Sequence, residues 1–519
     1  MSTVKIDFVP HFGAFVIETL TLGMYGESRN AIREYVQNCR DSLLQAIGDK
    51  LITADQARID VEMDADHNGL TIRDNGHGIR VENAAKVLAS IGASNKDYRR
   101  NAGFRGIGRL AGIVFCDRLI FRTKSKGQKQ FTEVVIRADE LREKLSPEET
   151  YAKDAAQTLA ECVDATLQDD ADADAHYFEV RLEGFHNAPA ECLDVELMRT
   201  FLGQVAPLPY AAEFPFAGEI EAAALKAGVP VESVHLFIKD GDAAAVELFK
   251  PYGSDVAVKR TRTPISISFE ASPTGKWFGW LGRKRVSGAI KEKHAGIRVR
   301  VRNIQIDDTK IIRDIFAESR LTSNARTSWG RFAEWYVGEI FVDPQAAIPN
   351  ARRDGFEENQ SWSTMRDELD LQVATPLGKL AYRTSKADKL SPANLTAAMD
   401  ALEAIVDQLE VDANPTMERL ETPLFTASDL RSRMASAKGI YEGDEAAQLD
   451  ALAVRLAAVQ LRLEALVALA PVHSCDEEIG LAIEEMAQHI LRELRDRLGP
   501  QDWLQARSVI ASVTGVKPK

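Results

Sequence analysis

The sequence predicts an α+β protein in three parts: two successive α/β domains followed by a C-terminal module that is wholly helical. In the first part, glycine-rich segments alternate with short apolar strands and helices. Further strand-like stretches lie between residues 234 and 306. From residue 391 onward, apolar residues recur every three or four positions, which is the period of an amphipathic helix. We therefore expect domains at residues 1–188, 189–388 and 389–519.

Composition and charge narrow the classes of function. A chain of 519 residues is long enough for about three domains, and its net charge of −14 argues against a general nucleic-acid coat protein. The five cysteines form no C-x-x-C pair, which indicates a reducing compartment and argues against structural zinc. The N-terminus lacks a signal pattern, and no apolar run approaches the roughly 18 residues of a membrane span. We expect a cytoplasmic protein outside the membrane.

A helix is predicted over residues 31–44, and it carries the first candidate site. Glu34, Asn38 and Asp41 lie at positions i, i+4 and i+7, so their side chains share one helical face. Two carboxylates and an amide in one stripe suit a magnesium–phosphate site, which needs a base and an oxygen ligand. A solvated polar face is the simpler alternative. The segments that follow favour the site.

Two glycine-rich segments follow this helix. The first, residues 70–79, is a short strand that ends in Asp74, Gly76 and Gly78, where a carboxylate could accept a hydrogen bond beside a closely approaching backbone. The second, residues 101–112, precedes an apolar run and could bind an anion through its backbone amides. Three of its glycines, Gly103, Gly106 and Gly108, are the candidates for this role. A strand with Thr123 near its end comes next.

These four segments, in this order across about 90 residues, resemble the signature motifs of the GHKL ATPases. The superfamily includes gyrase, the large heat-shock chaperone, histidine kinases and a mismatch-repair protein. The resemblance implies a Bergerat-type α/β sandwich that binds ATP and Mg²⁺. It implies that Glu34 is the general base, Asn38 the magnesium ligand and Asp74 the acceptor of the adenine amine. The other implied nucleotide-binding residues are Asp41, Gly76, Gly78, Gly103, Gly106, Gly108 and Thr123, with Lys96 in the lid segment 90–101 as a phosphate contact.

The sequence argues against two other nucleotide-binding motifs and against a histidine kinase. Residues 106–111 satisfy the G-x-G-x-x-A dinucleotide fingerprint, but the polar and basic residues before them do not form the buried strand that this fingerprint requires. A phosphate loop of the G-x-x-x-x-G-K-[ST] type is absent from the sequence. A histidine kinase would need a phosphoacceptor helix upstream, where the sequence offers His11 alone.

The second domain contains a basic stretch at residues 283–302, with eight lysines or arginines against Glu292. In its second half, arginines alternate with apolar residues, so one face of a strand is expected to be cationic. Such a face could bind nucleic acid or a γ-phosphate. The alternative is an ordinary edge strand whose charges prevent aggregation.

Residues 348–356 resemble the loop of the chaperone middle domain that sends an arginine to ATP. The resemblance assigns this role to Arg353, with Arg352 as the fallback if the register slips by one residue. A cation there would stabilise the charge that develops on the transferred phosphoryl oxygens. The alternative is a surface arginine pair near the start of a helix.

Apolar spacing in residues 389–519 predicts a helical hairpin or bundle, which either mediates dimerisation or packs within one chain. As a whole, the sequence indicates an ATPase clamp with a transducer-like middle domain, similar to the heat-shock chaperone and MORC-like ATPases. We expect a homodimer that acts on a protein or on nucleic acid. The alternative is a nucleotide-gated scaffold that does not hydrolyse ATP, in a stress or phage-defence complex.

Overall fold

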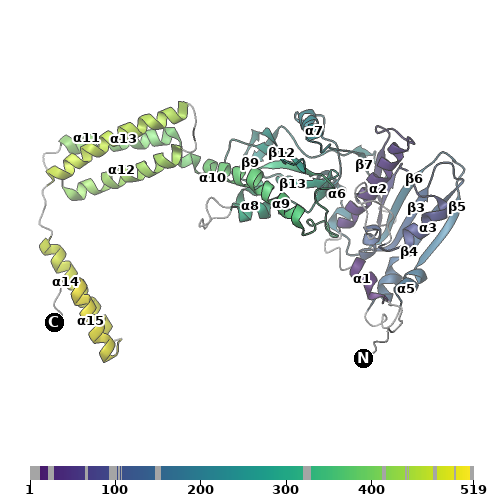
Figure 1. The fold of residues 1–519 in the computed structure, drawn as a ribbon, viewed down its shortest axis with the longest axis horizontal. Coiled ribbons are helices and arrows are strands. Elements are labelled where there is room, and N and C mark those ends of the chain that lie inside the picture. Colours follow the sequence, from purple (N-terminus) through teal and green to yellow (C-terminus); the bar gives the residue numbers. More distant parts are fainter. Residues whose placement is uncertain are drawn as a thin grey trace, which may run out of the picture. The chain divides into compact units, whose positions relative to one another are not determined.

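The structure is a computed structural model in which the described residues are 12–21, 29–64, 68–92, 102, 106, 108–146, 154–319, 329–411, 416–438, 441, 444–470, 476–495 and 498–514. The chain divides into two compact units, Met1–Ser385 and Lys386–Lys519. Figure 1 shows the order of the elements in each unit. The first unit contains both α/β parts, and the second is helical, as the sequence predicts.

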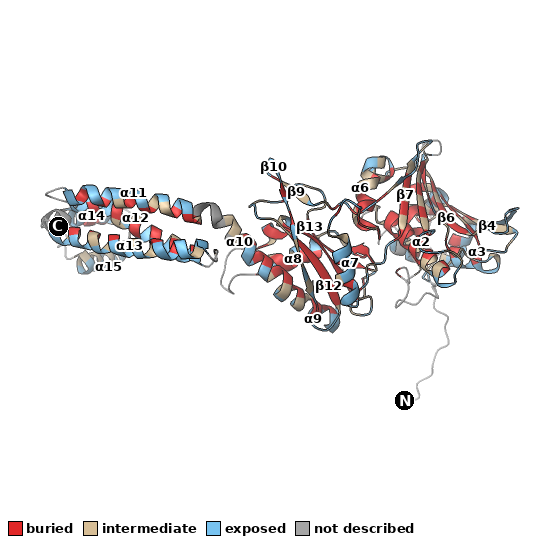
Figure 2. Cartoon of the chain, turned by 90° about the horizontal axis from the view of Figure 1, so that it is seen from above, coloured by how far each residue is buried: buried red, intermediate tan, exposed pale blue. Residues whose placement is uncertain are grey.

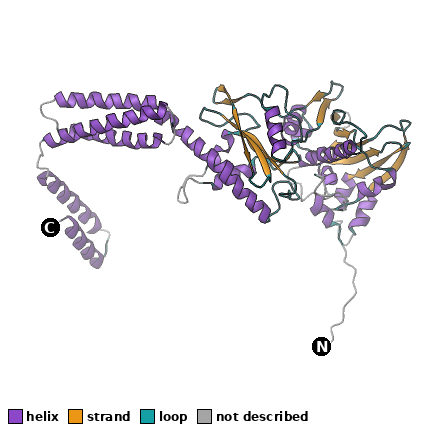
Figure 3. Cartoon of the chain, turned by 45° about the horizontal axis from the view of Figure 1, so that its top comes forward, coloured by secondary structure: helices purple, strands orange, loops and turns teal. Residues whose placement is uncertain are grey.

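The N-terminal part of the first unit is built on one large sheet with helices packed against it (Figure 3). In the described residues this sheet has eight strands in the order β5-β4-β3-β6-β2-β1-β7-β8, and all neighbours are antiparallel except β1 and β7. The strands are β1 (Arg58–Asp64), β2 (Gly69–Asp74), β3 (Cys116–Lys124), β4 (Gln130–Arg137), β5 (Val163–Asp169), β6 (Tyr177–Phe185), β7 (His235–Asp240) and β8 (Val246–Glu247).

Period-2 alternation decides which face of this sheet is buried. In β1, Ile59, Val61 and Met63 are buried while their neighbours are partly exposed, so the apolar face packs against helices. The helices of this part are α1 (Phe15–Thr21), α2 (Asn30–Gly48), α3 (Val81–Ala89), α4 (Ala138–Lys144), α5 (Ala155–Glu161) and α6 (Val195–Val205), with the 3₁₀ helices η1 (Gly108–Val114) and η2 (Ala190–Cys192). Helix α7 (Ala217–Lys226) instead packs in the core of the second sheet. Strand β7 lies beyond residue 188 in the sequence and nevertheless pairs with β1.

The second α/β part is built on a five-stranded sheet in the order β11-β12-β15-β13-β14. Its central strands are buried on both faces, because one core lies on each side of the sheet (Figure 2). The strands are β11 (Ser266–Ala271), β12 (Trp277–Arg283), β13 (Gly296–Val301), β14 (Ile304–Ile306) and β15 (Val337–Val342), and a separate hairpin joins β9 (Asp255–Val258) to β10 (Thr261–Pro264). The helical segments are α8 (Lys310–Glu318), η3 (Gly330–Trp335), α9 (Gln360–Leu369), the π-helical turn η4 (Asp370–Ala374) and α10 (Thr375–Leu390).

The prediction of an exposed cationic strand face is wrong for the second half of the basic stretch, which forms strand β13. Strand β13 lies between β15 and β14, so it is not an edge strand either. Arg298 is 1% exposed and Arg300 is 0% exposed. Arg300 forms an ion pair with Glu339, while the terminal nitrogens of Arg298 donate to the carbonyl of His294 at 2.6 Å and to Gln204 Oε1 at 3.2 Å. These two arginines are therefore not available to an external partner.

The helical unit contains α11 (Pro392–Val411), α12 (Met417–Lys438), α13 (Asp444–Leu469), α14 (Asp476–Arg495) and α15 (Pro500–Thr514). The first three helices share one apolar core, built from the residues that recur every three or four positions. Arg455 binds Asp400 and Glu403, and seven residues later Arg462 binds Asp407 and Glu410. Among the described residues, no helix combines the length and apolar character needed to cross a membrane.

Candidate functional site

The polar stripe of α2 lies inside the first unit and is not a solvated face. Glu34 is 8% exposed and Asp41 is 4% exposed, while Asn38 is half-buried on the same stripe. Ile32 and Val36 are buried in the core on the other side of the helix, which fixes its rotation. Buried carboxylates need polar partners, and both find them in segments that the sequence singled out.

Asp74 ends strand β2 and is held in one orientation. Its Oδ1 accepts hydrogen bonds from the Oγ of Ser42 at 2.9 Å and from the amide of Gly76 at 2.8 Å. Ser42 belongs to α2, so this contact also ties the helix to the end of the strand. The carboxylate is buried at 1% exposure.

The first glycine segment passes through a space that admits no side chain. A Cβ at Gly76 would lie 2.3 Å from Ser42 Oγ, and a Cβ at Gly78 would lie 1.9 Å from the carbonyl oxygen of Lys124. Gly78 also has a φ of +65°, which favours glycine. Just beyond it, the amide of Ile79 donates to Thr123 Oγ1 at 2.8 Å, so Thr123 attaches this segment to β3.

The second glycine segment meets the other carboxylates of α2. A Cβ at Gly108 would lie 2.6 Å from Glu34 Oε2, and Gly106 has a φ of +72°. The amide of Ala102 donates to Asp41 Oδ1 at 3.0 Å. Ala102 and Gly108 of this segment thus lie against the polar stripe. Lys96 and Gly103 lie outside the described residues.

Arg353 from the second α/β part reaches the same stripe. Its Nε lies 2.9 Å from Glu34 Oε1, and its guanidinium also donates to the carbonyl oxygen of Ala102. The neighbouring Arg352 has an exposed side chain, and its carbonyl oxygen accepts from Arg33 at 3.2 Å. Arg353, and not Arg352, therefore places its side chain at Glu34.

Sequence reasoning missed four residues of α2 that hold this arrangement together: Arg33, Tyr35, Arg40 and Ser42. The hydroxyl of Tyr35 accepts from the amide of Gly112 at 2.8 Å, which fixes η1 against the helix. Arg40 binds Asp41 at 3.3 Å and also Glu232, in the segment before β7. Arg33 and Arg40 are seven residues apart and so share a helical face, which is the sequence signal that could have identified them.

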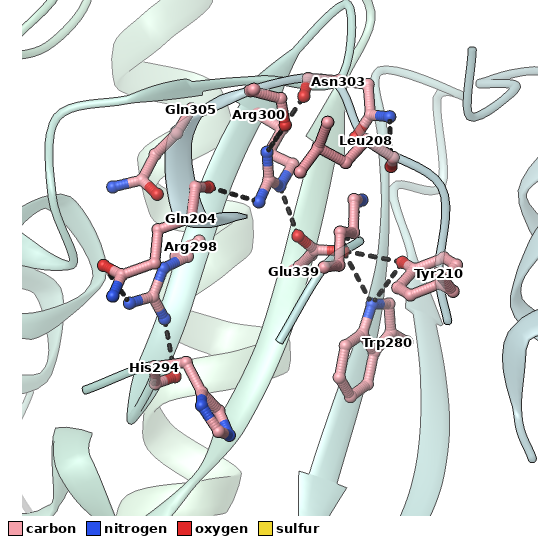
Figure 4. Close-up of polar contacts among 12 residues, drawn as sticks. Gln204, Leu208, Tyr210, Trp280, His294, Arg298, Arg300, Asn303, Gln305 and Glu339 are labelled. Atoms are coloured by element: carbon pink, nitrogen blue, oxygen red, sulfur yellow. Dashed lines mark hydrogen bonds and ion pairs between the residues drawn. The ribbon is translucent and has the colours of Figure 1, made fainter. Parts of the chain in front are cut away.

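A buried ionic network fixes the second sheet to the end of α6 and to the segment that follows it (Figure 4). Glu339 Oε2 accepts from Lys250 Nζ at 2.8 Å, from the Tyr210 hydroxyl at 2.6 Å and from Trp280 Nε1 at 3.3 Å. Arg300 binds the other oxygen of Glu339 and donates to the carbonyl of Gln204 at 2.6 Å. The network therefore joins strands β12, β13 and β15 to the connection between the two sheets.

Two opposing effects set the charge states in this network. Burial disfavours the ionised form of Glu339, but Arg300 and Lys250 more than compensate and lower its pKa to about 2. Burial lowers the pKa of Lys250 to about 7, although the carboxylate of Glu339 acts in the opposite direction. Glu339 is thus ionised at neutral pH, while Lys250 can lose its proton near neutral pH.

The residues present fit a nucleotide and a magnesium ion. The glycine segments leave no room for side chains next to a buried carboxylate, which suits a flat ligand held by backbone and by Asp74. The described residues contain no group of three metal-ligating side chains. Magnesium commonly takes one or two protein oxygens and completes its shell with phosphate and water, so Asn38 suits that mode of binding.

Fold and site together define an α/β nucleotide-binding domain joined to a second α/β part. Residues 26–166 match the family model described as "Histidine kinase-, DNA gyrase B-, and HSP90-like ATPase". The chain therefore carries a GHKL-type ATPase domain, and this match includes α2 and both glycine segments. No curated protein matches the chain.

Proposed function

We propose that the chain is an ATP-hydrolysing conformational clamp in which the second α/β part senses the state of the ATPase site. The observation that supports this most directly is the 2.9 Å ion pair between Arg353 and Glu34. It connects the proposed general base to a loop from a different sheet. Movement of that loop therefore changes the surroundings of the base, and a change at the base is transmitted to the loop.

In this proposal the nucleotide lies between α2 and the two glycine segments. Asp74 accepts a hydrogen bond from the adenine amine, because a carboxylate oriented by Ser42 and Gly76 presents an acceptor to that donor. Asn38 supplies an oxygen ligand to Mg²⁺. The remaining residues proposed to surround the nucleotide are Asp41, Gly76, Gly78, Lys96, Gly103, Gly106, Gly108 and Thr123.

The proposed chemistry needs a base and a cation. Glu34 orients the attacking water and accepts its proton, which general bases do when they lie within hydrogen-bond reach. Arg353 stabilises the charge that develops on the transferred phosphoryl oxygens. Magnesium, when bound, neutralises phosphate charge. Exclusion of water from the buried stripe strengthens each of these electrostatic contacts.

The partners belong to the proposal as well. The resemblance to the heat-shock chaperone and MORC-like ATPases favours a cytoplasmic homodimer that acts on a protein or nucleic-acid client. Helices α14 and α15 expose several large apolar side chains, which supports an assembly through the helical unit. These side chains are Ile483, Met486, Ile490, Leu504, Val509 and Val513.

A nucleotide-gated scaffold without hydrolysis, in a stress or phage-defence complex, is the second candidate. The observation that favours it is the ion pair between Arg353 and Glu34 Oε1, because a carboxylate oxygen paired with a guanidinium is a weaker proton acceptor. Both candidates bind ATP. They differ in turnover.

Two variants separate binding from chemistry. Glu34→Ala should bind ATP normally and lose turnover by about 10²–10⁴-fold, the usual contribution of a general base. Asp74→Asn should lose about ten-fold to over a hundred-fold in ATP affinity, because a charged hydrogen bond is worth roughly 1.5–3 kcal/mol. Calorimetric titration and phosphate release measure the two effects. If Glu34→Ala turns over ATP at the parent rate, the assigned base is wrong; if the parent binds ATP but releases no phosphate, the scaffold is correct.

A further inference from the structure

The β9–β10 hairpin and the loop between β12 and β13 lie against each other and form one surface, here called the basic hairpin surface (residues 255–264 and 284–294). Val258 forms a backbone bridge with Ile290, and the amide of Lys291 donates to the carbonyl of Ala257 at 3.0 Å. A Cβ at Gly288 would lie 3.7 Å from Cε of Lys259, so this lysine packs over the loop. The hairpin projects from the edge of the second α/β part (Figure 2).

This surface is strongly cationic in a chain whose net charge is −14. The two carboxylates of this surface bind groups of the surface itself. Asp255 binds Arg262 at 2.8 Å. Glu292 accepts from the amide of Ala257 at 2.7 Å and lies 3.4 Å from Arg262. Glu334 is exposed and adjoins the loop through its carbonyl, which accepts from Ile290. Five exposed cations outnumber it: Lys259, Arg260, Arg285, Lys291 and Lys293.

The loop that carries part of this charge has a fixed shape. Lys284 Nζ donates to the carbonyl of Gly288 at 2.6 Å and to that of Val286 at 3.0 Å, and it lies 4.8 Å from the ring centroid of Trp335. Lys284 thus serves as an internal support, and burial lowers its pKa to about 8. The neighbouring Arg285 is exposed. A preorganised loop loses little conformational entropy when it binds a partner.

The shape of the surface favours one class of polyanion. A two-stranded β-ribbon fits the major groove of B-form DNA, whereas the major groove of duplex RNA is too narrow for side chains to read. Single-stranded nucleic acid is held by exposed aromatic rings, and in the described part of this surface the adjoining ring of Trp335 is already covered by Lys284. We propose that the basic hairpin surface binds the phosphate backbone of double-stranded DNA, with the hairpin tip at the major groove.

This inference rests on the proposed function in that it names duplex DNA as the client, but its test does not require ATP turnover. The test is fluorescence anisotropy of a labelled DNA duplex with the full chain over a series of salt concentrations. Five phosphate contacts predict that log affinity falls against log salt with a slope of about −4.5. The double variant Lys259→Glu/Arg260→Glu should bind at least ten-fold more weakly, and its salt slope should be smaller by about 2. A neutral version, Lys259→Ser/Arg260→Ser, should show the same loss of slope.

The matched control is Lys126→Glu/Lys129→Glu, which reverses two exposed lysines between β3 and β4 on the other sheet and should bind the duplex like the parent. Equal duplex binding by the parent and both hairpin variants would overturn the proposal. Equal or tighter binding of single-stranded DNA or duplex RNA would also overturn it, as would no duplex binding at low salt. ATP turnover, measured on every variant, reports separately on the ATPase site.

Discussion

At the scale of single residues, Arg353 is the side chain on which the proposed communication depends. It contacts Glu34 and the carbonyl of Ala102, while the side chain of Arg352 is exposed. Arg353→Ala should lower ATP turnover at least about ten-fold with little change in ATP affinity, because the proposed contact of this arginine with the transferred phosphoryl group acts mostly in the transition state. Arg352→Ala is the matched control and should leave both quantities near the parent values. Phosphate release and calorimetric titration provide the measurements.

Two outcomes would contradict a catalytic role for Arg353. If Arg353→Ala raises turnover, the ion pair restrains Glu34 and the arginine is an inhibitor of the base. If Arg352→Ala and Arg353→Ala have equal effects, the loop matters through its backbone, since the carbonyl of Arg352 also binds Arg33. Either result would remove Arg353 from the proposed catalytic set.

The sequence alone placed much of the candidate site, for a local reason. Spacing along α2 shows that Glu34, Asn38 and Asp41 share a face, and glycines in a short segment show where the backbone must approach closely. Ser42 could not be found in this way, because its role depends on Asp74, which reaches it only after the sheet forms. The spacing of residues within one helix or strand does not show which side chains of another element they will contact.

At the scale of elements, strand β13 is a case in which the sequence predicts the element but not the burial of its faces. Alternating arginines correctly predict a strand, but the pattern contains no information on what covers its faces. Arg300 is buried because Glu339 on the neighbouring strand and the carbonyl of Gln204 satisfy it. The same alternation would describe a nucleic-acid surface if those partners were missing.

The network around Glu339 predicts an asymmetric effect on stability. Glu339→Gln leaves Arg300 buried without its counter-charge and should cost about 3–5 kcal/mol in the free energy of unfolding. Lys250→Met should cost clearly less, because Glu339 retains Arg300, Tyr210 and Trp280 as partners. Urea unfolding of the three proteins at neutral pH measures both differences. If both substitutions lower the free energy of unfolding equally, the charge of Glu339 is no more important to stability than that of Lys250.

A comparison of the parent with Lys250→Met at different pH values tests the pKa of Lys250. The pKa of Lys250 is about 7 in the folded protein and near 10.5 in the unfolded chain, so between these values the unfolded chain binds more protons. The cost of burying a charged lysine is therefore complete below pH 7 and declines as the pH rises toward 10.5. The stability of the parent relative to Lys250→Met should increase from pH 7 to pH 9. A constant difference would mean that Lys250 keeps one charge state throughout.

At the scale of the whole molecule, the fold class was predicted and the strand partners were not. Alternating elements and a helical C-terminal part are visible in the sequence because periodicity is local. The pairing of β7 with β1 joins segments that are about 177 residues apart, and no local pattern marks it. The domain boundary expected at residue 188 therefore falls within the part of the chain that builds the large sheet.

The division into two units predicts that the chain can be shortened after Ser385. Residues 1–385 retain the cores of both α/β parts and the Arg353–Glu34 contact, so this form should bind and hydrolyse ATP within about two-fold of the full chain. If the helical unit mediates assembly, the shortened form should also have a smaller mass by light scattering. A shortened form that is folded but inactive would show that the helical unit contributes to the ATPase cycle.

Arg353 also has a consequence for the evolution of stability. Its φ is +57°, a left-handed conformation that costs a non-glycine residue of order 1–3 kcal/mol. Glycine would relieve that strain and, at the same time, delete the guanidinium group that meets Glu34. Removing one partner of a buried ion pair costs about 3–5 kcal/mol, which is more than the strain that glycine would relieve. Selection for heat resistance alone would therefore retain the arginine at this position despite its strained backbone.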